Sequence, residues 1–218
     1  MVGLSAKLIA GVDEAGRGAV IGPLVICVAA IDKGKENSLR GLGVKDSKML
    51  GKERRSVLYE QILKICRVRV IKISAKELNL LMEKHTLNEI EAMACAPAIA
   101  SFNPDIAYVD SPDPQPKKFE LRLKKFGVSC NLVCENGADA KYPIVSAASI
   151  VAKVERDAEI DQIKKILGFD FNSGYPSDEK TRKFLENKKI EGKLLDYVRL
   201  KWRTLKKIRQ KKISDFFS

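Results

Sequence analysis

Hydrophobic and polar positions follow two alternating patterns along the chain, one typical of strands and one of helices. Apolar runs or strict alternation predict five strands, over residues 7–13, 19–31, 67–73, 105–110 and 128–134. Helical spacing predicts helices over residues 51–65, 116–126 and 143–167, the last with Pro143 in its first turn. Strands thus come first and then alternate with helices, which indicates a mixed sheet with helices on its faces.

Two capping boxes mark further helix starts. Ser74 is followed three residues later by Glu77, and Thr86 by Glu89. In this pattern each side chain bonds the backbone of the other residue, so it predicts that helices begin at both places. The second helix should extend to about Ser101. A loop rich in Gly and Pro follows at residues 172–178, and basic helices should end the chain.

Length and composition favour one globular body with appendages. The chain has 218 residues, of which 45% are hydrophobic, and this is enough to fill a core. No apolar run reaches the roughly 20 residues that a membrane span needs. We expect a main domain over residues 1–172, a basic helical extension over 173–209 and a tail over 210–218.

The net charge of +12 is concentrated near the C-terminus. Residues 180–212 contain fourteen Lys and Arg against three acidic residues, a net of +11. A basic segment attached to a nearly neutral body favours a polyanionic partner such as nucleic acid. The alternative is a solvated helix face without a partner.

The five cysteines show no pattern of a disulfide framework or a zinc site. Three lie in apolar segments, and Cys130 and Cys134 have no second pair to complete a metal site. The first ten residues also contain one Lys and too short an apolar stretch for a secretory signal. We therefore expect free thiols in a cytoplasmic protein.

Four acidic residues stand where predicted strands end. Asp13 and Glu14 close the first strand, Asp110 closes the fourth, and Asp139 follows the fifth. Each alone is more typical of a turn, but strand ends of an open sheet are also where ligands bind. Magnesium takes oxygen ligands, and two such ions about 4 Å apart can serve phosphodiester hydrolysis. With the basic segment, these acids suggest metal-dependent chemistry on nucleic acid without identifying the reaction.

Blocks along the chain resemble the type 2 ribonuclease H family, also called ribonuclease HII. The opening block runs GVDEAGRG from Gly11 and continues as VIGP from Val20. The later blocks are KDSK (45–48), TLNE (86–89), YVD (108–110), AD (138–139), SAASIVAKVERD (146–157) and SGYPSD (173–178). An ordered series that covers the chain to about Arg209 is far more specific than any single motif.

The resemblance implies a ribonuclease H-like fold, with a mixed five-stranded sheet flanked by helices and a helical C-terminal extension. It implies that Asp13, Glu14, Asp110 and Asp139 bind two Mg²⁺ or Mn²⁺ ions. The implied reaction cuts the RNA strand of RNA–DNA hybrids, and duplex DNA on the 5′ side of single ribonucleotides. The products carry 3′-hydroxyl and 5′-phosphate ends.

The resemblance also implies a set of substrate-binding residues. A glycine–arginine–glycine loop would recognise the 2′-hydroxyl, which distinguishes RNA from DNA, and a tyrosine would stack on the sugar. Two further residues match phosphate contacts, and one lysine is a basic neighbour of the site. The loop is formed by Gly16, Arg17 and Gly18, and the tyrosine is Tyr175. Ser47 and Lys48 match the phosphate contacts, and the lysine is Lys153. One departure is Gly137, where many relatives carry a basic residue.

The last residues resemble a peptide that docks on sliding clamps of the proliferating-cell-nuclear-antigen type. The pattern Q-x-x-I-x-x-F-F is formed by Gln210, Ile213, Phe216 and Phe217. A short helical turn would place the three apolar side chains on one side as a plug. Such tails are typical of archaeal-like members, and clamp binding would tether the enzyme to replicated DNA. Alternatively, the two Phe pack back on the body.

Two other functions remain open at this stage. A DNA-directed nuclease or integrase-like protein could share the fold, although the glycine–arginine–glycine loop and Tyr175 favour ribose recognition. A clamp-tethered protein that binds hybrids without catalysis is a second alternative. Against it, carboxylates gathered near phosphates repel them unless a metal intervenes. We therefore expect a monomeric type 2 ribonuclease H.

Overall fold

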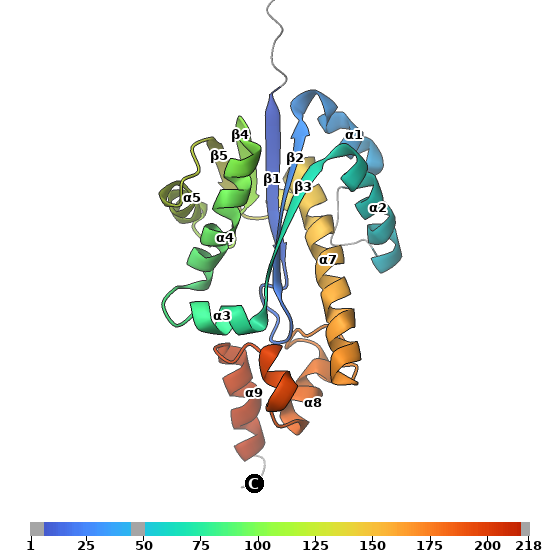
Figure 1. Ribbon diagram of the computed structural model, residues 1–218, viewed down its shortest axis with the longest axis vertical. Helices are drawn as coiled ribbons and strands as arrows, with labels where there is room; N and C mark the ends of the chain where they lie inside the picture. Colours follow the sequence, from blue (N-terminus) through green and yellow to red (C-terminus); the bar gives the residue numbers. More distant parts are fainter. Residues whose placement is uncertain (1–6, 45–50, 215–218) are drawn as a thin grey trace, which may run out of the picture. The chain divides into compact units, whose positions relative to one another are not determined.

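The computed structural model describes residues 7–44 and 51–214. Its centre is a five-stranded mixed sheet with the strand order β3-β2-β1-β4-β5 (Figure 1). The strands are β1 (Leu8–Ala15), β2 (Leu24–Asp32), β3 (Arg67–Ile73), β4 (Ile106–Asp110) and β5 (Asn131–Glu135). β4 pairs in parallel with both β1 and β5. The mixed sheet predicted from the sequence is confirmed.

Two strands begin several residues later than the sequence predicts, and β1 extends two residues beyond its predicted end. The second strand was expected from Ala19 but begins at Leu24, although residues 19–23 are fully buried. Gly22, at a φ of +91°, interrupts the extended backbone there, and Ile21 makes only an isolated bridge with Val198. Apolar character at residues 19–23 therefore reflects burial in another core, not pairing in the sheet. The fifth strand begins at Asn131, three residues later than expected.

The helices follow most of the expected spacing. The bounds are α1 (Glu36–Leu42), α2 (Lys52–Ile65), α3 (Ala75–Leu81), α4 (Leu87–Phe102), α5 (Pro116–Lys125), α6 (Ala138–Lys141), α7 (Pro143–Leu167), α8 (Glu179–Asn187) and α9 (Arg203–Ser214). The 3-10 helices are η1 (Lys33–Lys35) and η2 (Gly192–Asp196). Both capping boxes are present, at Ser74 and at Thr86. The sequence analysis did not predict the short elements α1, α6, η1 and η2, because a segment of so few residues is too short to show a helical period.

The chain forms two compact units. The first contains residues 1–15, 26–71 and 86–154, and therefore most of the sheet. The second contains residues 16–25, 72–85 and 155–218. It has a hydrophobic core of its own, in which Val20 and Ile21 pack with side chains of α7, α8 and α9 such as Ile160, Phe184 and Leu205.

In the first unit, helices cover both faces of β1. On one face, Gly11 lies against the backbone of Ile144 and Val145 at the start of α7. On the other face, Val12 lies in a cluster with Cys95 of α4 and Phe119 of α5. β1 is thus a central strand with five consecutive buried residues. No helix within residues 7–44 and 51–214 has the length and apolar character to span a membrane.

Gly11→Ala should destabilise the protein by about 1–3 kcal/mol, the usual cost of overpacking a core. A Cβ at residue 11 would lie 2.6 Å from the nitrogen of Val145 and closer still to the carbonyl of Ile144, so strand and helix must separate. Urea denaturation measures the change in the free energy of unfolding. The matched control is Gly41→Ala in α1, where a Cβ meets nothing within 4 Å. This control should be neutral or slightly stabilising, and equal losses in both variants would contradict the close packing.

Candidate functional site

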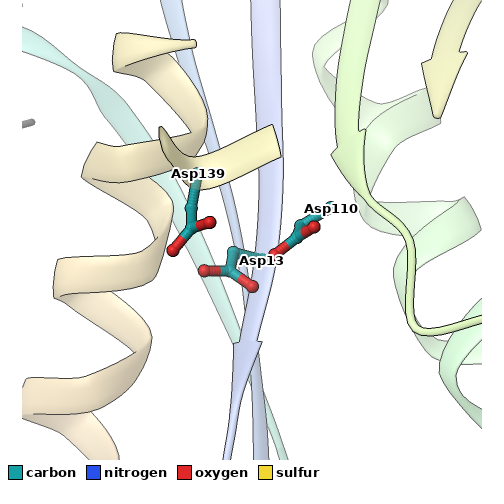
Figure 2. A group of neighbouring side chains, drawn as sticks. All are labelled: Asp13, Asp110 and Asp139. Atoms are coloured by element: carbon teal, nitrogen blue, oxygen red, sulfur yellow. The ribbon is translucent and has the colours of Figure 1, made fainter. Parts of the chain in front are cut away.

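Three carboxylates converge in the first unit, from three different elements. Asp13 lies on β1, Asp110 is the last residue of β4, and Asp139 is on the short helix α6. One oxygen from each lies within 4.8 Å of those of the other two. Figure 2 shows the three carboxylates turned toward a common space. We call Asp13, Asp110 and Asp139 the carboxylate trio.

The sheet register accounts for two members of the trio. Val12 pairs with Val109 in the parallel ladder of β1 and β4, so that the next residues, Asp13 and Asp110, end up side by side. The third member, Asp139, was expected in a loop after a strand. It lies instead on α6, which follows Gly137 in the left-handed conformation at a φ of +70°.

Burial dominates the electrostatics of Asp13. Its side chain is buried, and the loss of solvation raises its pKa to about 7. Lys153 and a hydrogen bond from Ser149 oppose this rise, while the neighbouring Asp110 adds to it. Lys153 and Ser149 are one turn apart on α7, and the lysine donates a hydrogen bond to the serine hydroxyl. The predicted basic neighbour Lys153 therefore acts electrostatically on Asp13.

The donor set suits a hard divalent cation. Asp13 and Asp139 are buried and Asp110 is half-buried, so the three acids can be charged together only at a cost in free energy. A cation among them removes that cost, and carboxylate oxygens are the ligands that Mg²⁺ and Mn²⁺ prefer. The trio can therefore hold such an ion, as the strand-end acids suggested.

Glu14, the fourth predicted ligand, is not a member of the trio. Glu14 follows Asp13 on β1, where successive side chains alternate between faces, and it lines a small cavity with Glu91, Cys95 and Asp110. Asp110 thus borders both this cavity and the trio. The cavity volume is about 10 Å³, room for about one water molecule. Glu91 is 2% exposed, and the sequence analysis missed it. Its position four residues before Cys95, on the apolar side of α4, is the signal that could have identified it.

The second unit contains the glycine–arginine–glycine loop and Tyr175. Gly16 has a φ of +85°, and its N–H donates a 3.0 Å hydrogen bond to the Tyr175 hydroxyl. A Cβ on Gly16 would collide with the side chain of Arg156, whereas one on Gly18 would only touch the tyrosine ring. The Arg156 guanidinium lies 4.5 Å from the centre of that ring. The loop and the tyrosine are therefore held as one cluster.

Two buried arginines support this cluster, and the sequence analysis identified neither. Arg156 donates a 2.8 Å hydrogen bond to the carbonyl of Ser173, two residues before Tyr175. Arg199 is fully buried, and it donates to the carbonyls of Arg17 (3.1 Å) and Gly22 (2.9 Å). Arg156 lies in one of the resembling blocks, which could have indicated it. Arg199 stands among many surface cations, and nothing in its local sequence sets it apart.

Several predicted residues cannot be placed. Ser47 and Lys48 lie outside the described residues, as do Phe216 and Phe217 of the tail. Gln210 and Ile213 belong to the backbone of α9, which extends to Ser214. The helix thus continues into the segment expected as a separate tail.

Comparisons with known proteins agree with this geometry. The chain matches the family Ribonuclease HII over residues 10–205. It is 47% identical over 207 residues to ribonuclease HII of Archaeoglobus fulgidus, which covers 95% of this chain and 99% of that protein. The structure is similar to that of the PCNA:RNase HII complex from the same organism, with a TM-score of 0.83, 46% identity and coverage of 90% and 95%. For ribonuclease H2 from Pyrococcus horikoshii, the TM-score is 0.79 at 40% identity, with coverage of 94% and 99%.

Asp13→Asn should stabilise the metal-free protein at alkaline pH. The folded-state pKa of Asp13 is raised from 3.8 to about 7. The folded protein therefore favours the protonated form of Asp13. The stability associated with this proton is fully present below about pH 4 and is lost as the pH rises through 7. Urea denaturation in a chelator should show a gain of about 2–4 kcal/mol at pH 9 and little change at pH 4, because a tenfold change in proton affinity corresponds to about 1.4 kcal/mol.

Saturating Mg²⁺ provides the control for this variant. The ion should stabilise the wild-type protein at pH 9 by binding the folded state, and it should stabilise Asp13→Asn much less. If the variant is equally destabilised at both pH values, burial does not disfavour the charged form of Asp13.

Proposed function

This chain belongs to the ribonuclease HII family, and on that premise we propose that it cuts duplex DNA on the 5′ side of single embedded ribonucleotides and hydrolyses the RNA strand of RNA–DNA hybrids. The observation that carries the proposal is the convergence of Asp13, Asp110 and Asp139 on a space that suits a divalent cation. The products would carry 3′-hydroxyl and 5′-phosphate ends.

We propose Asp13, Glu14, Asp110 and Asp139 as the ligands of two Mg²⁺ or Mn²⁺ ions. When bound, such ions supply Lewis-acid stabilisation of the charge that develops on the phosphate during hydrolysis. The pairing of β1 with β4 and the backbone hydrogen bonds to Asp110 hold the carboxylates in place, and the burial of Asp13 and Asp139 limits the access of bulk water. Lys153 balances part of the negative charge through its interaction with Asp13.

The loop of Gly16, Arg17 and Gly18 would recognise the 2′-hydroxyl with backbone groups. A Cβ on Gly18 would only touch the Tyr175 ring, so the absence of a side chain there permits close approach to a sugar, and the hydrogen bond from Gly16 to Tyr175 supports a joint role. Tyr175 would pack on the sugar at the RNA–DNA junction. Ser47 and Lys48 would contact phosphates, and the basic segment over residues 173–209 would add nonspecific attraction to the duplex.

We further propose a cytoplasmic monomer that docks on a sliding clamp of the proliferating-cell-nuclear-antigen type. A relative of 46% identity has been solved as a complex with PCNA, which supports this partner. Gln210 and Ile213 lie on α9 in the spacing that a docking helix requires. Five free cysteines fit a reducing compartment.

Cleavage of a labelled DNA duplex with one ribonucleotide tests the reaction. With Mg²⁺, the wild type should make a single cut 5′ of the ribonucleotide. Asp110→Asn should lose at least about a hundredfold in rate, the scale for removing one group that stabilises developing charge. Asp32→Asn at the end of β2, where the carboxylate is half-exposed, is the matched control and should cut normally.

The alternatives give different outcomes in the same assay. If neither the wild type nor Asp110→Asn cuts, but hybrids still bind tightly, the protein is a non-catalytic hybrid-binding protein. Equal cutting of an all-DNA duplex would instead indicate a DNA-directed nuclease.

Removal of residues 210–218 should abolish clamp binding, measured by calorimetry, and leave cleavage of short oligonucleotides unchanged. The double variant Phe216→Ala and Phe217→Ala should act in the same way, because it removes the apolar plug. Ser214→Ala, at a variable position of the pattern, serves as the control. Unchanged clamp affinity of the truncated protein would refute the docking proposal.

A further inference from the structure

The turn between β5 and α6 connects two members of the carboxylate trio. One oxygen of Asp110, Oδ1, accepts hydrogen bonds from the backbone N–H groups of Gly137 (2.7 Å) and Ala138 (3.1 Å). Asp139 is the next residue. Any movement of this turn would therefore change the orientation of Asp110 and the position of Asp139 together.

Asn136 connects this turn to the segment that leaves β4. Its side-chain nitrogen donates to two carbonyl oxygens, those of Ser111 and Asp113, at 2.9 Å each. The Ser111 N–H also donates to the carbonyl of Glu135 at 2.8 Å. Both Ser111 and Asp113 are 7% exposed, so water cannot easily replace the amide as a donor to these carbonyls.

Asp113 is itself held from two helices. Its Oδ2 accepts from the side chains of Asn88 on α4 (2.9 Å) and Arg122 on α5 (2.7 Å), and its Oδ1 accepts from the N–H of Gln115 (3.0 Å). These contacts hold the pKa of Asp113 below its usual value, led by the Gln115 hydrogen bond. The segment to which Asn136 bonds is therefore fixed to the body of the first unit. Asn88 belongs to the TLNE block, for which the family resemblance implied no role.

We propose that Asn136 is a positioning residue of the carboxylate trio, which holds the turn of Gly137 and Ala138 against the segment after β4 and thereby increases the affinity for divalent cations. The inference rests on the proposed metal-dependent function. A turn that is ordered before binding requires no ordering when a cation arrives, and outer contacts of metal ligands commonly change metal affinity. Asn88 acts in the same direction through Asp113.

Direct metal binding separates a positioning role from a purely structural one. Mn²⁺ is titrated into the full chain without substrate, and the free ion is measured by its paramagnetic resonance signal. Asn136→Ala should bind Mn²⁺ about tenfold more weakly than the wild type, the lower end of the usual effect of outer contacts. Asn88→Ala should weaken binding in the same direction.

Asn131→Ala is the matched control. It makes the same change on an exposed residue at the opposite end of β5, and it should leave Mn²⁺ affinity unchanged. Melting curves in a chelator compare the stability of the variants, so that a loss of affinity is assessed only for folded protein. Cleavage by Asn136→Ala should recover toward the wild-type rate as Mn²⁺ approaches saturation.

The outcomes distinguish this inference from the proposed function. If Asn136→Ala and Asn88→Ala bind Mn²⁺ as tightly as the wild type, the positioning role is overturned, whereas metal-dependent cleavage by the wild type would still stand. If the wild type binds no Mn²⁺, both proposals fail. A loss of affinity of equal size in Asn131→Ala would also overturn the role, because the effect would not depend on the turn.

Discussion

The convergence of three carboxylates in one partly buried place is the constraint on which the first unit depends. Like charges repel strongly where water is excluded, so the chain must hold Asp13, Asp110 and Asp139 by packing and backbone hydrogen bonds. The parallel pairing of β1 with β4 places two of them side by side. The close contact of Gly11 with the start of α7 holds the helix that follows the third. Burial, and to a smaller degree the neighbouring Asp110, raises the pKa of Asp13, which reflects the free-energy cost of this arrangement.

A different kind of support holds the loop of Gly16, Arg17 and Gly18 in the second unit. Here the backbone carbonyl of Arg17 in the loop accepts a hydrogen bond from the buried Arg199, and Arg156 packs on the tyrosine that the loop contacts. Planar guanidinium groups suit this role because each can donate in several fixed directions at once. Arg156 and Arg199 are buried and therefore serve the internal structure, not a basic surface.

Local patterns explain why much of the fold was predictable. Capping boxes at Ser74 and Thr86 involve residues only three apart, and the 25-residue helix α7 has Pro143 at its start. Residues 19–23 show the limit of such reasoning. Their apolar side chains were correctly expected to be buried, but a strand was wrongly assigned, because hydrophobic content alone does not reveal whether the backbone pairs in a sheet or packs as a loop.

The sequence by itself determined the mixed sheet, most helices, the family and the acids from which the trio is drawn. These depend on spacing within short segments or on ordered motifs. Only the tertiary structure decided that Asp13, Asp110 and Asp139 meet while Glu14 faces a cavity with Glu91, and that Arg199 is buried. Arg199 donates to the carbonyl of a residue 182 positions away. Contacts over such separations leave no local pattern, because the partners become neighbours only when the chain has folded.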